Sequence, residues 1–207
     1  MPPPLTTARL TLLPWSLATK EHKDGLVAAW DDPEVWRYVV RLDGRDGFDR
    51  ATLDRALQRA QERRLLDDEL LVVRNSDRAV LGVCGLYPSW LDDGAPDDTD
   101  LGYRYGRAFW GQGYGLEAAT EVLRWATEER GLDHVGSNVQ SPNVASHRIL
   151  RRLGFTFLET RPVPADPSRT ADWYVWTAPQ GNASRTRARP HERACHLAAE
   201  RPRTGSA

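Results

Sequence analysis

Three glycines stand at alternate positions between residues 111 and 115, immediately ahead of an amphipathic helical pattern. Before them, Leu101, Tyr103 and Tyr105 alternate with smaller or polar residues, which is typical of a strand. The unpaired amides of a first helical turn point outward, and the helix dipole favours negative charge beside them. Because glycine has no Cβ, the backbone can also approach a phosphate closely. The segment therefore predicts a diphosphate-binding loop made of Gly111, Gln112, Gly113, Tyr114 and Gly115.

The spacing of these glycines disfavours two common nucleotide-binding patterns. A dinucleotide-binding turn has the pattern G-x-G-x-x-G, whereas this chain has G-x-G-x-G. A P-loop needs Lys and then Ser or Thr after its last glycine, and Leu116 and Glu117 stand there instead. A glycine-rich turn that binds no ligand stays the alternative at this point.

A second block follows the loop. A helical pattern over 116–129 ends at Gly131, and an extended run over 134–140 comes next. Asn143 is a good N-cap for a helix over 144–153, which Gly154 ends. The string N-x-x-S-x-x-x-L-x-x-x-G-F over 143–155 resembles the second half of the core of the GNAT acyltransferases. The string W-G-Q-G-Y-G over 110–115 is similar to their coenzyme A pyrophosphate loop.

Together the two blocks resemble the ribosomal-protein N-terminal acetyltransferase (RimJ/RimL-like) branch of the GNAT superfamily. Trp110 agrees with this branch, at a position where many GNAT members carry Gln or Arg. Weaker blocks over 7–14, 31–35 and 81–86 extend the resemblance, which covers roughly residues 5–177.

The order of the predicted elements is mixed α/β, and the resemblance implies the same. We expect an α/β (α+β) domain over residues 1–178, with a mostly antiparallel central sheet of about seven strands and about four flanking helices. The expected strands are Leu10–Leu13, Leu70–Arg74, Ala79–Leu86, Asp100–Tyr105, His134–Asn138, Phe155–Glu159 and Trp173–Thr177. The expected helices are Gly25–Asp31 (with or without an extension past Pro33), Arg50–Arg64, Leu116–Glu129 and Val144–Leu153.

Composition narrows the class of protein further. Of the residues, 40% are hydrophobic and 28% charged, which is ordinary for a globular domain. No apolar run approaches the roughly 18 residues of a membrane span, and the start lacks the basic and apolar regions of a secretory signal. Cys84 and Cys195 make no disulfide framework, Cys84 being expected as a buried small hydrophobe. No His/Cys cluster has metal spacing, so we expect a cytoplasmic protein with no metal.

The last 29 residues differ from the rest. Residues 179–207 hold six Arg and two Glu, a formal charge of +4, but one Leu and no aromatic residue. Such a segment can bury little, so we expect a disordered tail. Without aromatic side chains for base stacking, a nucleic-acid partner is not expected.

The resemblance implies direct transfer of an acetyl group from acetyl-CoA, as co-substrate, to a primary amine. An amide on the strand before the loop would bind the oxyanion, which maps to Tyr103, Arg104 and Tyr105. Ser146 is the expected acid for the departing thiolate, with Asn143 also near the coenzyme. Tyr174 is the second candidate acid. In the alternatives the tyrosines only pack, Asn143 only caps the helix, and Ser146 is only its partner.

The proton acceptor and the acetyl acceptor are not fixed by the sequence. Glu117, Glu159 and Asp166 are carboxylates near the expected site, and a water relay is equally consistent. A run with five Asp over 91–100 is attractive to cations but also typical of a solvated turn. The acceptor is either a protein N-terminus or a small amine, and the protein either a monomer or a homodimer. A non-catalytic acyl-CoA-binding sensor module is the alternative function.

Overall fold

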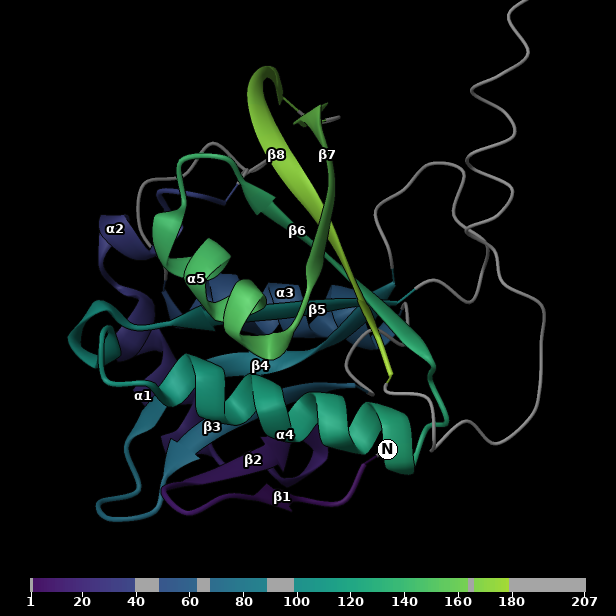
Figure 1. Cartoon of the computed structure of the whole chain (residues 1–207). Coiled ribbons are helices and arrows are strands. Elements are labelled where there is room, and N and C mark those ends of the chain that lie inside the picture. Colours follow the sequence, from purple (N-terminus) through teal and green to yellow (C-terminus); the bar gives the residue numbers. More distant parts are fainter. Residues whose placement is uncertain (1, 40–48, 63–67, 89–98, 164–165, 179–207) are drawn as a thin grey trace, which may run out of the picture.

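A computed structural model describes residues 2–39, 49–62, 68–88, 99–163 and 166–178. Within them, eight strands form one sheet in the order β1-β2-β3-β4-β5-β6-β8-β7 (Figure 1). All neighbours are antiparallel except β5 and β6, which are parallel. The strands are β1 (Leu5–Thr6), β2 (Leu10–Pro14), β3 (Glu69–Arg74), β4 (Val80–Pro88), β5 (Thr99–Tyr105), β6 (His134–Gln140), β7 (Thr156–Val163) and β8 (Asp166–Thr177). The mixed, mostly antiparallel sheet is confirmed.

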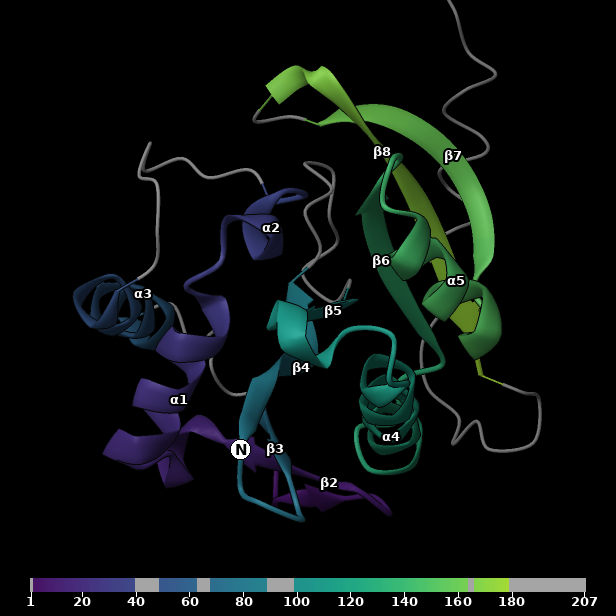
Figure 2. The ribbon, with the colours of Figure 1, turned by 90° about the vertical axis from the view of Figure 1, so that its left-hand side faces the viewer.

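The helices cover the two faces of the sheet. Figure 2 shows α1 (Lys20–Trp30), α2 (Pro33–Trp36) and α3 (Arg50–Glu62) on one face. The opposite face carries α4 (Tyr114–Glu128) and α5 (Val144–Leu153). Two single turns of 3-10 helix complete the described elements, at Trp15–Leu17 and Arg107–Phe109.

The first helix begins earlier than its sequence pattern predicted. Thr19 caps α1, because its side chain accepts a hydrogen bond from the backbone N–H of His22. The extension past Pro33 is a separate helix, since Asp32 caps α2 and accepts from the N–H of Glu34 at 2.9 Å. Proline is favoured at a first helical position, so Pro33 opens α2 and does not continue α1.

Two hydrophobic cores lie on the two faces of the sheet. One joins the sheet to α4 and α5, with Val122 and Leu150 among its fully buried side chains. The other joins the sheet to α1 and α3, through Leu26 and Leu53. Cys84 is fully buried in the first core, which confirms the expectation of a small hydrophobe.

The β7–β8 hairpin is longer than predicted and extends beyond the other strands (Figure 1). Most of β7 is exposed, so its side chains show no apolar alternation and the sequence pattern ends too early. Among the described residues, no helix combines the length and hydropathy that a membrane crossing requires. Most of the acidic run over 91–100 and the whole tail over 179–207 lie outside the described residues.

Candidate functional site

The glycine loop, which we define as residues 111–115, joins a short 3-10 turn to α4. Gly111 and Gly113 have φ angles of +73° and +82°, a region that L-residues with a Cβ rarely adopt. Gly111, Gln112 and Gly113 are all exposed. Two of the three glycines are therefore required by the backbone itself, at a surface open to a ligand.

Gly115 has a packing role that the spacing of the glycines did not predict. The helix begins at Tyr114 and not at Leu116, so Gly115 lies inside its first turn. A Cβ there would stand 3.1 Å from Cδ1 of Ile149 on α5 and 3.4 Å from the ring of Tyr105. Gly115 thus allows close packing of α4 against its neighbours, which a spacing pattern alone does not distinguish from ligand approach.

No side chain among the described residues caps the N-terminus of α4. Its N-cap residue is Gly113, and the first helical hydrogen bond runs from the N–H of Glu117 to the carbonyl of Gly113 at 3.1 Å. The preceding amides of the first turn are left to solvent or to a ligand. Together with the helix dipole, this arrangement favours an anionic group at the loop.

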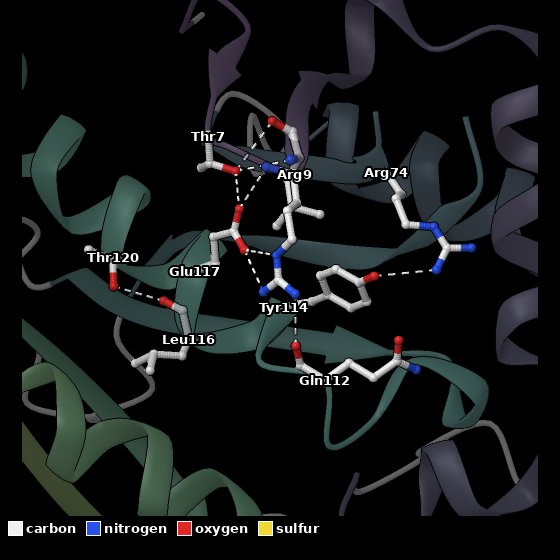
Figure 3. A network of polar contacts seen from close by, with 9 residues as sticks. Thr7, Arg9, Arg74, Gln112, Tyr114, Leu116, Glu117 and Thr120 are labelled. Carbon is white, nitrogen blue, oxygen red and sulfur yellow. Dashed lines mark hydrogen bonds and ion pairs between the residues drawn. The ribbon is translucent and has the colours of Figure 1, made fainter. Parts of the chain in front are cut away.

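A polar network fixes the loop to the start of the chain (Figure 3). The guanidinium of Arg9 donates to the carbonyl of Gln112 at 3.1 Å and to Glu117 at 2.6 Å. Thr7 donates its hydroxyl to the other carboxylate oxygen of Glu117. Burial alone would raise the pKa of Glu117, but the hydrogen bonds from Thr7 and Arg9 and the charge of Arg9 lower it. Glu117 is therefore an anchored anion in this network.

A shallow groove of about 510 Å³ runs beside the network. Its lining is formed by Thr7, Arg9, Gly113, Leu116, Glu117, Thr120 and Glu121. The groove thus continues from the glycine loop along the exposed side of α4.

The sheet opens next to the loop. The strands β5 and β6 are paired at one position only, Asp100 with Gly136, and Ser137 donates its hydroxyl to the carbonyl of Leu101 at 2.9 Å. Beyond this point no β5–β6 pairing is present in the described residues, so one edge of β5 faces a gap. Tyr103, Arg104 and Tyr105 lie on this segment, where the predicted oxyanion donor was placed.

Side chains of this segment point to opposite faces. Tyr103 donates its hydroxyl to the carbonyl of Ser146 at 3.4 Å, and Tyr105 is buried on the same face. Arg104 lies on the other face, with its guanidinium 4.9 Å from the ring of Trp30 and 4.5 Å from that of Trp36. The structure brings Tyr103 and Ser146 together at the gap and places the side chain of Arg104 away from them.

At the start of α5, Asn143 is the N-cap. Its side-chain oxygen accepts from the backbone N–H of Ser146 at 3.2 Å. The cap uses the Ser146 backbone, and the serine hydroxyl makes no hydrogen bond among the described residues. The hydroxyl is thus free for a role that capping does not require.

Tyr174 is buried, and its hydroxyl already has a partner. It lies 2.9 Å from Nδ1 of His147, whose Nε2 is 3.1 Å from the carbonyl of Ser141. Because that carbonyl can only accept, Nε2 of His147 donates to it, and Nδ1 forms a second hydrogen bond with the tyrosine hydroxyl. His147 was not predicted from the sequence, because it sits next to Ser146 among arginines and gives no local signal of burial.

The carboxylates near the gap have defined partners. Asp100 is buried and accepts from the side chain of Asn138 at 3.2 Å. A Cβ on Gly136 would clash with the Asp100 carboxylate, so the glycine makes room for it. Glu159, one of the candidates from sequence, is instead exposed and paired with Arg161. Within the described residues no group of His, Cys, Asp and Glu could hold a metal ion.

Comparisons with known proteins agree with this geometry. The chain is 42% identical over 64 residues to FsC-acetyl coenzyme A-N(2)-transacetylase of Aspergillus fumigatus, a match that spans 31% of this chain and 27% of that protein. A GNAT-family acetyltransferase from Bacillus anthracis has a similar structure, with a TM-score of 0.68, 14% identity, and coverage of 84% of this chain and 98% of its own.

A structure of RimL, a ribosomal-protein alpha-N acetyltransferase in complex with coenzyme A, is similar with a TM-score of 0.64 and 14% identity, over 83% of this chain and 95% of that one. At these identities the structures establish the fold and not the branch. The family described as "Acetyltransferase (GNAT) domain" matches residues 9–156. With the glycine loop, the uncapped helix and the gap in the sheet, this match shows that the chain belongs to the GNAT acetyltransferase family, whose members use acetyl-CoA.

Proposed function

We propose that this protein transfers the acetyl group of acetyl-CoA to a primary amine. The observation that carries the proposal is the exposed glycine loop at the uncapped N-terminus of α4, beside the β5–β6 gap. The loop amides would bind the pyrophosphate, and the gap would receive the arm that ends in the thioester. The resemblance of the two blocks to the RimJ/RimL-like branch makes a protein N-terminus one acceptor class and a small amine the other.

The chain supplies three groups for the chemistry in this proposal. A backbone amide of the segment 103–105 would donate to the oxyanion of the tetrahedral intermediate. The hydroxyl of Ser146 would protonate the departing thiolate. The amine would lose its proton to the buried carboxylate of Asp100 or through water. Tyr174 is the second candidate acid, although its hydroxyl is engaged by His147.

Thiol release from acetyl-CoA tests the proposal directly. The purified chain is assayed against two sets of acceptors, peptides with free N-termini and small primary amines. We expect turnover with one of the two sets, and binding of coenzyme A in calorimetric titration. Matched peptides with blocked N-termini control for other nucleophiles.

The alternative, a sensor module, predicts another pattern. It would bind acetyl-CoA with no turnover on either set of acceptors. Gly113→Asp serves as the control variant, because it adds a side chain and a negative charge at the expected pyrophosphate position. We expect it to weaken coenzyme binding at least tenfold, about 1.4 kcal/mol. A folded variant with unchanged affinity would contradict the placement of the phosphates.

A further inference from the structure

Arg9 links the glycine loop to a segment more than 100 residues earlier in the chain. Its backbone is held on two sides, because its N–H donates to Glu117 at 3.0 Å and its carbonyl accepts from the N–H of Asn75 at 2.9 Å. Its guanidinium lies 4.5 Å from the ring of Tyr114, the first residue of α4. Its position is therefore fixed before any ligand arrives.

Besides the contact with Arg9, the exposed part of the loop is held by the Gln112 side chain, which donates to the carbonyl of Ala108 at 2.8 Å, and by the bond from the N–H of Glu117 to the carbonyl of Gly113. Gly111 and Gly113 can adopt many backbone conformations, and each conformation that turns the amides away from a phosphate lowers the competent fraction. The hydrogen bond from Arg9 to the Gln112 carbonyl lies between these two glycines. It selects one orientation of the peptide in the middle of the loop.

We propose, on the basis of the proposed function, that Arg9 is a positioning residue for coenzyme binding. It holds the Gln112 carbonyl, and Glu117 holds Arg9, so that the amides of the glycine loop stay directed toward the pyrophosphate (Figure 3). The pairing of Arg9 with Glu117 also offsets a negative charge close to the expected pyrophosphate. A lone Glu117 carboxylate one turn from the loop would repel a diphosphate, and Arg9 neutralises it.

The contacts favour positioning over direct binding of a phosphate. Nε and one terminal nitrogen of the guanidinium face Glu117, and the other terminal nitrogen faces the Gln112 carbonyl. All three nitrogens thus have partners within the protein. Three of the five guanidinium N–H groups are used within the protein, and one N–H on each terminal nitrogen remains for any direct contact with a phosphate.

Titration with coenzyme A by calorimetry, alongside thermal melting, tests this role. We expect Arg9→Met to raise the Kd about tenfold and Arg9→Lys to give an intermediate value, because a single ammonium lacks the separate nitrogens with which the guanidinium reaches its two partners. Glu117→Gln is the decisive variant. If Glu117 positions Arg9, this variant weakens binding by at least threefold. If Arg9 instead binds phosphate directly, the variant frees its charge and tightens binding, which would overturn the proposal.

The chain offers a closely matched control on the same helix. Arg124 and Glu121 form an ion pair whose side chains are 41% and 17% exposed, against 48% and 18% for Arg9 and Glu117, and Arg124 also pairs with Glu128 and Glu129. Arg124→Met should lower the melting temperature about as much as Arg9→Met and leave the Kd unchanged. If Arg9→Met, Arg9→Lys and Glu117→Gln all bind coenzyme A with the wild-type Kd, the Arg9–Glu117 pair has a structural role and does not position the loop for binding.

Failure of this inference is distinguishable from failure of the proposed function. If the wild-type chain does not bind coenzyme A, the proposed function itself is wrong. If the wild type binds and the variants match it, only the positioning role is wrong. Should Arg9→Met not fold, Arg9→Lys and Glu117→Gln still decide the outcome, because each keeps a side chain of similar size and polarity.

Discussion

Replacing Gly111 by alanine should weaken coenzyme binding while sparing stability. Its φ of +73° lies in the left-handed region, where a residue with a Cβ costs about 1–2 kcal/mol. A Cβ at Gly111 would meet no described heavy atom within 4 Å, so strain is the whole effect. Since no backbone hydrogen bond involves Gly111 among those described, the loop can relax locally. The cost then appears only when a ligand requires the original conformation.

The expected magnitude follows from that strain. A cost of 1–2 kcal/mol corresponds to a rise in Kd of roughly 5- to 30-fold. Gly131 is the matched control, with a φ of +66° and equally open space where a Cβ would stand. It follows α4, where Leu132 donates to the carbonyl of Ala126 at 2.9 Å, so its conformation cannot relax without losing helix-end contacts. Gly131→Ala should therefore lower the melting temperature by about 2–8 °C and leave the Kd unchanged.

Calorimetric titration with coenzyme A and thermal melting of both variants test the contrast. Gly111→Asn should recover part of the lost affinity, because asparagine tolerates the left-handed region better than alanine. If Gly111→Ala binds coenzyme A as well as Gly131→Ala does, the loop conformation is not what the ligand recognises. That result would refute the reasoning.

Three further outcomes are expected from the structure. Ser146→Ala should lower kcat by about 10²–10⁴-fold with little change in coenzyme Kd or melting temperature, and a steady-state rate within threefold of wild type would remove the serine from the chemistry. Burial raises the pKa of the Cys84 thiol to about 12. In a Cys195→Ser variant, where Cys84 is the remaining cysteine, a thiol reagent at pH 8 should therefore react only after denaturation. Fast labelling of the native variant would contradict this burial. The hydrogen bond from Arg74 lowers the pKa of Asp77 to about 2. The ionised Asp77 therefore stabilises the folded protein above about pH 4, and this stabilisation is lost as the pH falls toward 2. In Asp77→Asn the melting temperature should depend less on pH in that interval, and an unchanged slope would show that the Arg74–Asp77 pair adds no stability.

Local chemistry marks some elements well enough to predict them from sequence. The helix Val144–Leu153 has the predicted bounds, because an asparagine cap at one end and Gly154 at the other, with a φ of +88°, both leave a signal. The glycine loop was predicted for a related reason, since Gly111 and Gly113 do adopt positive φ. Gly115 has the same spacing and also a packing role, which the sequence did not indicate because it depends on Ile149 of another helix.

Contacts between distant segments left no such signal. Arg9 and Glu117 are 108 residues apart, and nothing in either local sequence indicates that they pair. The strand β1 is only two residues long, too short for a periodic pattern. His147 is polar yet buried, because its partners Tyr174 and Ser141 come from β8 and the turn before α5. These features depend on tertiary structure and were found only there.

In the described part of the chain, β5 and β6 pair at a single position, which gives the sheet a seam. The five strands on one side and the three on the other are joined by ladders of several residue pairs between most neighbours, but across the seam the described backbone contributes one pairing. Local opening should therefore begin there, and amide exchange along 102–105 should be fastest at the edge that faces β6. A ligand bound in the seam would slow that exchange, because it would contact both β5 and β6 and connect the two parts of the sheet. If the proposed site is right, the region that the fold leaves weakest is the one that coenzyme binding would stabilise most.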